Sequence, residues 1–150
     1  MADLRWIVYH HTNTGDARPT VRSIAEYQTG PTSHLDFPAI AYTVFVDPDG
    51  TAYLCHDLDV VTWGQGDGSP WSRRGVGGNN WRGLAVAFAG EHPTAAQLVK
   101  LKLVGDEIDR RLDRRLLRLG HRDVSIGDDG QPLTECPGSK WPEWRAEVGG

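Results

Sequence analysis

The sequence predicts an α/β fold in which a mixed central β-sheet is flanked by helices. Three observations carry this prediction: short apolar runs recur along the chain, a hairpin signal joins two of them, and a long amphipathic stretch follows the last run. Strand-like runs combined with a long helix are typical of α/β domains. A chain of 150 residues, 39% of them hydrophobic and 24% charged, is expected to form a single domain over residues 1–150.

Two strands and a hairpin are expected in the first part of the chain. Residues 6–12 (WIVYHHT) and 41–46 (AYTVFV) are rich in aromatic and β-branched residues, which favour strands. The sequence DPDG at 47–50 carries proline and glycine at the second and fourth positions of a β-turn. The segment that starts at Thr51 (TAYLCH) is therefore expected to return as a hairpin partner.

A short helix and a buried strand are expected between these elements and the long helix. Residues 21–28 follow Thr20, which can act as an N-cap, and Gly30 lies just past their end. Residues 83–90 (GLAVAFAG) form a short apolar run bounded by glycines, which is typical of a central strand buried on both faces.

The long helix is expected to begin at a capping box and to end near Gly120. Thr94 and Gln97 have the spacing of that box. Gly105 interrupts the helical pattern, and the glycine at position 120 stands where a C-terminal glycine belongs. The apolar stripe comprises Leu98, Leu101, Ile108, Leu112, Leu116 and Leu119. A last short helix is expected after Pro137.

Residues 62–82 contain six glycines and three tryptophans with almost no periodicity. A loop of this length inside a compact domain is usually functional or mobile. Its tryptophans either anchor packing or form a flat binding wall, since aromatic rings offer large apolar areas at low entropy cost.

Composition argues against two classes of partner. The formal net charge is −4, whereas nucleic-acid binding needs a clustered positive face. No apolar run approaches the roughly 20 residues needed to cross a bilayer, so no membrane insertion is expected. The N-terminus lacks the pattern of a secretory signal, and the chain is expected to be made in the cytoplasm.

Two histidines and a cysteine are expected at the ends of secondary-structure elements or in a loop, where their side chains can reach a shared site. His10 ends the first strand, His121 follows the long helix, and Cys136 lies in a loop. Two imidazoles and one thiolate suit zinc, with a fourth position left for water, although their spacing matches no specific zinc motif. A buried cysteine is more often a small hydrophobic residue, and His11 should face the opposite side of the strand unless the strand bulges there.

Four motifs then occur in order along the chain: IVYHHT, AYTVFVDPDGTAY, GHRDV and TECPG. In this order and at these intervals they resemble the zinc-dependent N-acetylmuramoyl-L-alanine amidases, a family that includes phage endolysins and animal peptidoglycan recognition proteins. The resemblance runs from about Trp6 to Trp144. It implies the fold of that family, Zn²⁺ as cofactor and bacterial peptidoglycan as partner.

The resemblance also implies roles for individual residues. The zinc ligands of the family fall on His10, His121 and Cys136, with His11 as an alternative first ligand if the strand bulges. A tyrosine that faces the metal matches Tyr42. Thr134 stands two residues before the cysteine, where members carry lysine or threonine, and both residues are candidates for stabilising the oxyanion.

Two positions depart from the family pattern. Some members use a glutamate on the apolar strand, but this position matches Ala87 here. Members often carry a Trp-His pair after the hairpin, whereas Trp63 is followed by Gly64. The glycan and stem peptide are expected to lie across the glycine-rich loop, and the candidate wall residues are Trp63, Trp71, Asn79, Asn80 and Trp81.

The implied function is a peptidoglycan hydrolase that cleaves the amide between N-acetylmuramic acid and L-alanine by zinc-activated water. A monomeric, phage-type lysin that leaves the cytoplasm through a pore made by another protein is expected. The alternative is an inactive peptidoglycan-binding module, a type in which the cysteine ligand is typically missing. A zinc deaminase is disfavoured because the H-x-E and P-C-x-x-C patterns are absent, and a structural domain without zinc is the remaining reading.

Overall fold

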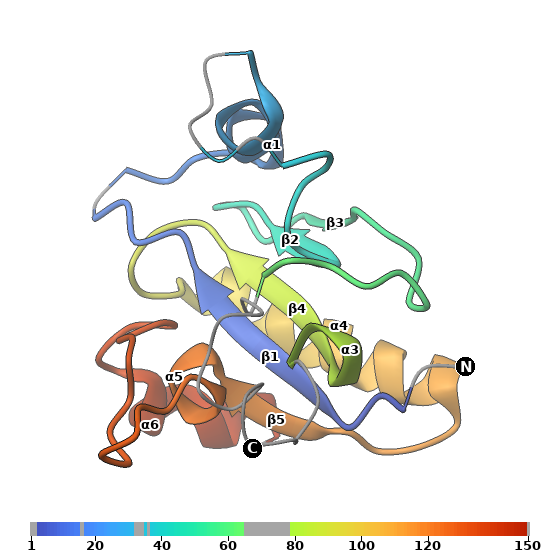
Figure 1. Ribbon diagram of the computed structural model, residues 1–150. Coiled ribbons are helices and arrows are strands. Elements are labelled where there is room, and N and C mark those ends of the chain that lie inside the picture. The colour runs from blue at the N-terminus through green and yellow to red at the C-terminus, as the bar shows by residue number, and fades with distance from the viewer. Residues whose placement is uncertain (1–2, 16, 32–34, 36, 65–78, 150) are drawn as a thin grey trace.

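The computed structural model describes residues 3–15, 17–31, 35, 37–64 and 79–149, which form a mixed sheet flanked by helices (Figure 1). The sheet has five strands in the order β3-β2-β4-β1-β5. Four strands run parallel, and β3 pairs antiparallel with β2 at one edge, so the predicted α/β class is confirmed. The strands are β1 (Trp6–His11), β2 (Val44–Val46), β3 (Ala52–Leu54), β4 (Gly83–Phe88) and β5 (Leu117–Gly120).

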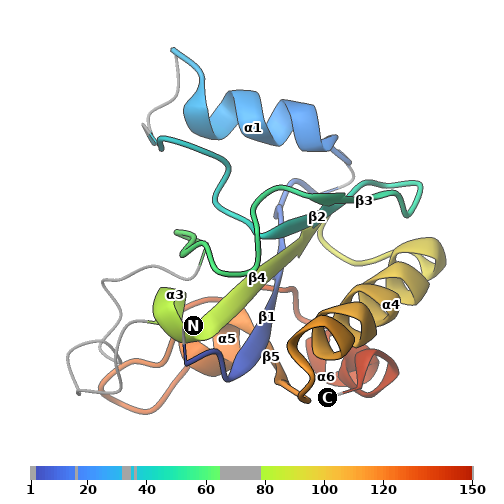
Figure 2. The ribbon, with the colours of Figure 1, turned by 90° about the vertical axis from the view of Figure 1, so that its right-hand side faces the viewer.

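Helices cover both faces of this sheet, with α1 on one face and α4 on the other (Figure 2). Side chains of a strand alternate between the faces, so each face has its own apolar layer. Tyr9 and Val86 belong to the larger layer under α4, whereas Phe45 and Ala87 pack with Ile24 of α1. The helical elements are α1 (Val21–Thr29), α3 (Asn79–Arg82), α4 (Ala95–Leu112), α5 (His121–Val124), α6 (Trp141–Trp144) and the 3₁₀ helix η1 (Arg145–Val148).

Most of the predicted elements are present. The hairpin of β2 and β3 forms, and every residue of β4 is buried. The Thr20 side chain accepts a hydrogen bond from the backbone N–H of Ser23 at the start of α1. Thr94 and Gln97 form both hydrogen bonds of the predicted capping box. The second strand is shorter than expected and starts at Val44.

The prediction that the long helix reaches Gly120 is wrong. Helix α4 ends at Leu112, where Asp113 adopts the left-handed conformation with φ 50°, and the chain then returns as β5. The Asp109 side chain accepts a hydrogen bond from the backbone N–H of Leu116 at 3.0 Å, which fixes this reversal. His121 therefore follows a strand and not a helix.

Helix α4 continues through Gly105 without interruption. The glycine at this position allows the helix to pack closely against the sheet. A Cβ atom there would lie 2.9 Å from Nε of Arg118 and 3.0 Å from the hydroxyl of Tyr9. The close approach of helix and sheet thus requires glycine, and the entropy cost of about 1 kcal/mol relative to alanine is accepted at this position.

The expected loop at residues 62–82 is only partly within the described residues. Its last residues form the short helix α3, which leads directly into β4. Residues 65–78 lie outside the described part of the chain. Among the described residues, no helix has the length and apolar character that crossing a bilayer requires.

Candidate metal centre

Three side chains from distant parts of the chain converge at one edge of the sheet. The ligand atoms of His10, His121 and Cys136 all lie within 4.8 Å of one another. Sγ of Cys136 is 3.7 Å from Nδ1 of His10, and the two imidazole centroids are 4.6 Å apart. We call these three residues the His-His-Cys cluster.

The sheet register explains how the two histidines meet. Strands β1 and β5 are parallel neighbours, and Tyr9 lies opposite Gly120. The residue that follows each of them is a histidine, His10 on β1 and His121 at the start of α5, and both histidines lie at the carboxyl edge of the sheet. Such edges are where open α/β sheets carry their functional groups.

The backbone brings the cysteine to the same place. The carbonyl of Cys136 accepts a hydrogen bond from the N–H of Arg122 at 2.7 Å, which ties its loop to the residue after His121. Its sulfur accepts a further hydrogen bond from the N–H of His11 at 3.4 Å. The cluster is thus held by main-chain contacts as well as by side-chain packing.

The electrostatic state of the cluster fits a divalent cation. Burial, with repulsion from the neighbouring histidines, lowers the pKa of His10 well below its usual value, so that its imidazole is neutral at pH 7. Within the described residues, the buried Nε2 of His10 has no hydrogen-bond partner. Burial raises the pKa of the Cys136 thiol to about 12, and a bound cation would favour the thiolate instead.

His11 has a separate environment. Its Nδ1 lies 3.1 Å from the backbone oxygen of Glu91, to which it donates, and its ring lies near Phe88. Ala87 lies beside His10 in the sheet register, whereas His11 lies beside Phe88 on the opposite face. His11 thus lies outside the His-His-Cys cluster, as strand alternation predicts.

Tyr42 and Thr134 lie close to the cluster. The Tyr42 ring centroid is 5.6 Å from that of His10. Burial first, and the nearby Cys136 second, raise the pKa of Tyr42 above its usual value, so its hydroxyl keeps the proton. The Thr134 hydroxyl oxygen accepts a hydrogen bond from the N–H of Cys136 at 3.1 Å, which leaves its own O–H able to donate elsewhere.

Three of the candidate wall residues lie on α3, away from the His-His-Cys cluster. Helix α3, which carries Asn79, Asn80 and Trp81, precedes Gly83, and Gly83 lies beside Trp6 at the amino edge of the parallel strands. The cluster lies at the carboxyl edge, so α3 lies at the opposite end of the parallel strands, and a role of these three residues in substrate binding stays a prediction. The Asn80 side chain is also buried, with 3% of its surface exposed.

The other two tryptophans of residues 62–82, Trp63 and Trp71, have different outcomes. Trp63 is 43% exposed and stacks on Phe37, with ring centroids 6.4 Å apart. It remains a candidate for substrate contact, while Trp71 lies outside the described residues.

Both departures from the family pattern are visible in the packing. Ala87 lies directly beside His10, so a methyl group stands where a carboxylate would face the cluster. A Cβ atom on Gly64 would lie 2.8 Å from Cβ of Ala85 and 2.9 Å from the backbone oxygen of Ala41. The glycine at this position is therefore required by close packing.

One carboxylate at the cluster was not among the predicted site residues. Oδ2 of Asp123 accepts hydrogen bonds from the backbone N–H of Gly120 and from the indole of Trp141, both at 2.8 Å. The three-residue spacing of Gly120 and Asp123 is that of a capping box, which is the only sequence signal that could have indicated this contact.

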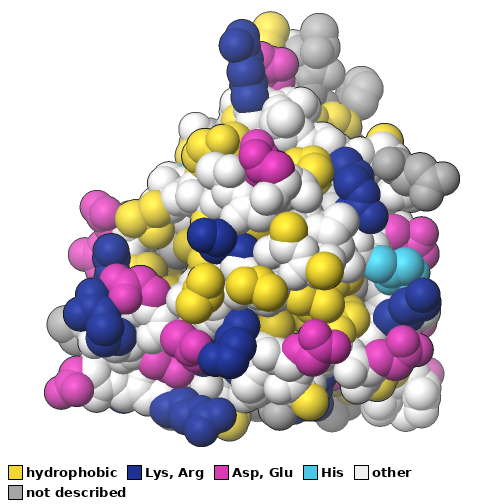
Figure 3. Space-filling model, turned by 180° about the vertical axis from the view of Figure 1, so that it is seen from behind, with side chains coloured by type: hydrophobic (Ala, Val, Ile, Leu, Met, Phe, Trp, Pro, Cys, Tyr) yellow, Lys and Arg dark blue, Asp and Glu magenta, His cyan; other side chains and the backbone are white. Residues whose placement is uncertain are grey.

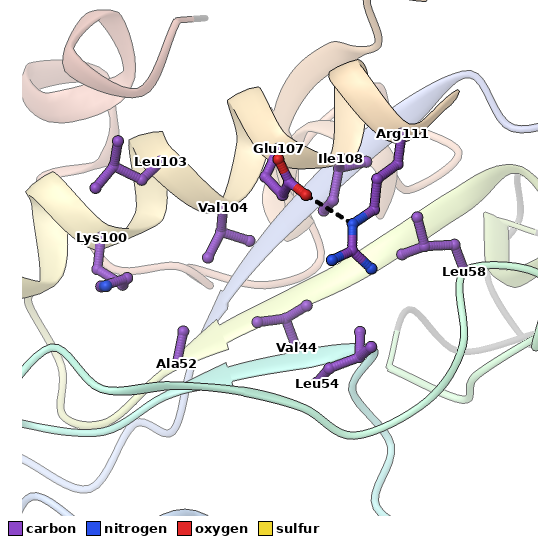
Figure 4. A pocket seen from close by; sticks show the side chains of 10 residues that line it. All are labelled: Val44, Ala52, Leu54, Leu58, Lys100, Leu103, Val104, Glu107, Ile108 and Arg111. Carbon is purple, nitrogen blue, oxygen red and sulfur yellow. Dashed lines mark hydrogen bonds and ion pairs between the residues drawn. The ribbon is translucent and has the colours of Figure 1, made fainter. Parts of the chain in front are cut away.

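A separate hollow lies on the α4 face, where apolar side chains gather between charged ones (Figure 3). This groove of about 320 Å³ runs between α4 and the edge formed by β2 and β3 (Figure 4). Val44 and Ile108, which line it, belong to the layer under α4, and Glu107 pairs with Arg111 at its rim at 2.8 Å. The groove thus lies on the face opposite His10.

A mixed α/β sheet that carries two histidines and a cysteine at its carboxyl edge defines a candidate metal-dependent hydrolase. The family model for N-acetylmuramoyl-L-alanine amidase matches residues 1–139, and the chain belongs to that family. The resemblance noted in the sequence is thereby confirmed. No curated protein matches the chain.

Solved structures agree on the fold. The amidase LysC from Clostridium intestinale URNW is 25% identical, with a TM-score of 0.68 over 98% of this chain and 86% of that one. The endolysin of Thermus scotoductus bacteriophage Ph2119 is 18% identical, with a TM-score of 0.70 over 100% and 88% of the two chains. The peptidoglycan recognition protein LE, solved with tracheal cytotoxin, is 21% identical, with a TM-score of 0.66 over 97% and 81%.

Proposed function

We propose that this chain is a zinc-dependent N-acetylmuramoyl-L-alanine amidase that cleaves the amide between the lactyl group of N-acetylmuramic acid and L-alanine. The observation that carries the proposal is the convergence of His10, His121 and Cys136, whose ligand atoms lie within 4.8 Å of one another. Membership of the amidase family supports the choice of substrate.

The donor set suits zinc. Two neutral imidazoles and one thiolate form a three-residue site of the kind that leaves a position for water. Zinc, when bound, lowers the pKa of water to about 7 and polarises a substrate carbonyl. In the chain itself, Nδ1 of His10, which lies 3.7 Å from the sulfur of Cys136, and the buried Cys136 thiol are the groups that gain most from such an ion.

Tyr42 and Thr134 are proposed to stabilise the negative charge that develops on the amide oxygen. The Tyr42 hydroxyl stays protonated because burial raises its pKa, so it can donate a hydrogen bond at neutral pH. Thr134 already binds the N–H of Cys136 through its oxygen and can donate its own proton. Each such donor is typically worth about 3 kcal/mol in the transition state.

The biological setting is proposed on the same basis. Likeness to a clostridial amidase and a phage endolysin supports a lysin that acts on the bacterial cell wall. A monomeric single domain that reaches the wall through a pore made by another protein is the simplest form of this proposal. The likeness to peptidoglycan recognition proteins keeps a binding module without activity as the second candidate.

The deciding experiment is mass spectrometry of purified cell wall after incubation with the zinc-loaded protein. We expect free stem peptides with new L-alanine amino termini. A Cys136→Ser variant at the same concentration is the control and should release none. Wall that is bound by the parent protein without new amino termini would establish the binding module instead.

A further inference from the structure

The corner between β5 and α5 is held by one carboxylate. His121 is the first residue of α5, and the Gly120 N–H immediately before it donates to Oδ2 of Asp123 at 2.8 Å. The indole N–H of Trp141 donates to the same oxygen at 2.8 Å. One carboxylate oxygen thus connects the backbone beside His121 to helix α6.

The anchor at the other end of this connection is rigid. Trp141 is 1% exposed, and its ring packs against Tyr9 and Trp144 with centroid distances of 5.8 Å and 4.6 Å. A buried aromatic ring with two ring neighbours has few alternative rotamers. Movement of Asp123 is therefore restricted by the core of the molecule.

The same corner is closely packed against the cysteine loop. A Cβ on Gly120 would lie 2.7 Å from Cδ of Pro137 and 2.9 Å from the Trp141 indole nitrogen. The N–H of Arg122 donates to the carbonyl of Cys136 at 2.7 Å. A shift of the β5–α5 corner would thus change the separation between His121 and Cys136.

We infer that Asp123 is a positioning residue that holds His121 at coordinating distance from Cys136 and so sets the affinity for the metal. The inference rests on the proposed metal site. Ligands held in place before binding lose less conformational freedom when the ion arrives, and residues behind metal ligands commonly change affinity about 10- to 100-fold when replaced.

The test uses purified full-length protein, with zinc as the probe in competition with a chelator. Asp123→Ala removes both hydrogen bonds and should weaken zinc binding at least about 10-fold. Trp141→Phe removes the indole donor together with part of the buried ring, and Asp123→Asn keeps an acceptor oxygen, so both should weaken binding less than Asp123→Ala. Asp123→Asn preserves side-chain volume and carries the test if Asp123→Ala does not fold.

The matched control is Asp129→Ala. This exposed carboxylate lies in the loop that follows α5 and also accepts a backbone N–H, that of Gln131 at 2.9 Å, but no contact joins it to a cluster residue in the described chain. Its zinc affinity should equal that of the parent.

Unfolding temperatures of the zinc-free and zinc-loaded forms separate positioning from plain stability. A positioning role predicts that Asp123→Ala reduces the increase in unfolding temperature that zinc produces, because that increase depends on affinity. Equal zinc affinity in the parent, Asp123→Ala, Asp123→Asn and Trp141→Phe would overturn the inference and leave the proposed function intact. A parent protein that binds no zinc would overturn both.

Discussion

The environment of Cys136 distinguishes a metal ligand from an ordinary buried apolar side chain. Its thiol is buried, and burial raises its pKa to about 12. The N–H of His11 nevertheless points at the sulfur, a contact that favours the thiolate. An apolar core has no need of this donor, whereas a metal ligand benefits from it.

Replacement of the two cysteines should therefore have opposite results. Cys136→Ser should lose zinc and turnover together, because a serine hydroxyl does not ionise near neutral pH. Cys55→Ser should retain both, since Cys55 is half-buried and lies outside the cluster. Elemental analysis and peptide-release assays measure the two properties, and zinc loss in Cys55→Ser would mean that the wrong cysteine was assigned.

Tyr42→Phe separates catalysis from metal binding. The change removes the hydroxyl but keeps the ring beside His10, so zinc content should stay at that of the parent. Loss of one oxyanion donor predicts a fall in kcat of about 100-fold. Tyr27→Phe, at a side chain that is 65% exposed, is the control. Unchanged kcat in Tyr42→Phe would exclude this tyrosine from the reaction.

At the level of single residues, the sequence was sufficient to predict that His10, His121 and Cys136 meet, whereas the roles of the candidate wall residues stay predictions. The three candidate ligands can be recognised because each belongs to an ordered motif. Wall residues depend on which edge of the sheet a loop reaches, and composition carries no such information. Trp81 illustrates this, because it lies next to the start of β4 and not its end.

At the level of elements, the long helix shows why the sequence predicted an end near Gly120, whereas α4 ends at Leu112. Leu116 and Leu119 continue the helical spacing of the apolar stripe, but Leu116 is buried just before β5, and Leu119 belongs to that strand. A periodicity of apolar residues does not reveal a left-handed residue such as Asp113. The Asp109 carboxylate holds the boundary through two partners, the Leu116 N–H and the side chain of Arg118, which lies nine residues further along the chain.

This contact predicts a large loss of stability for Asp109→Ala. Arg118 has a side chain that is 3% exposed and pairs with Asp109 at 2.7 Å. Removal of the carboxylate leaves a buried guanidinium without this partner, which should cost about 3 kcal/mol of unfolding free energy. Denaturant titration measures this quantity.

Glu107→Ala is the matched control on the same helix. Glu107 pairs with Arg110 and Arg111 at the surface, where water screens the charges. Its replacement should change stability much less than that of Asp109. Equal effects of the two substitutions would contradict the role given to the Asp109–Arg118 pair.

At the level of the whole molecule, each face of the sheet carries a tyrosine with a raised pKa, Tyr9 fully buried on one face and Tyr42 partly buried on the other. Burial raises the pKa of Tyr9 under α4 and that of Tyr42 on the α1 face above the usual value. In the unfolded chain, both release their protons above about pH 10. The folded state therefore holds more protons than the unfolded state in this range, and stability must fall as the pH rises.

The unfolding free energy is thus expected to decline above pH 10, by up to about 1.4 kcal/mol per pH unit for each tyrosine. Tyr9→Phe should remove the contribution of Tyr9 to this slope. It should lower the free energy of unfolding only slightly at neutral pH, because the Tyr9 hydroxyl has no hydrogen-bond partner among the described residues. Denaturant titrations at pH 9 to 11 measure the slope. A slope in Tyr9→Phe as steep as in the parent would refute this account.

The packing around Gly64 makes a larger residue hard to accommodate at this position. Mutation of Ala85 could relieve one of the two close contacts, but the other is with the main-chain oxygen of Ala41, which no substitution removes. Introducing histidine at position 64 would thus require the backbone to shift beside Tyr42. Attempts to place a histidine at position 64 should therefore begin by rebuilding that segment.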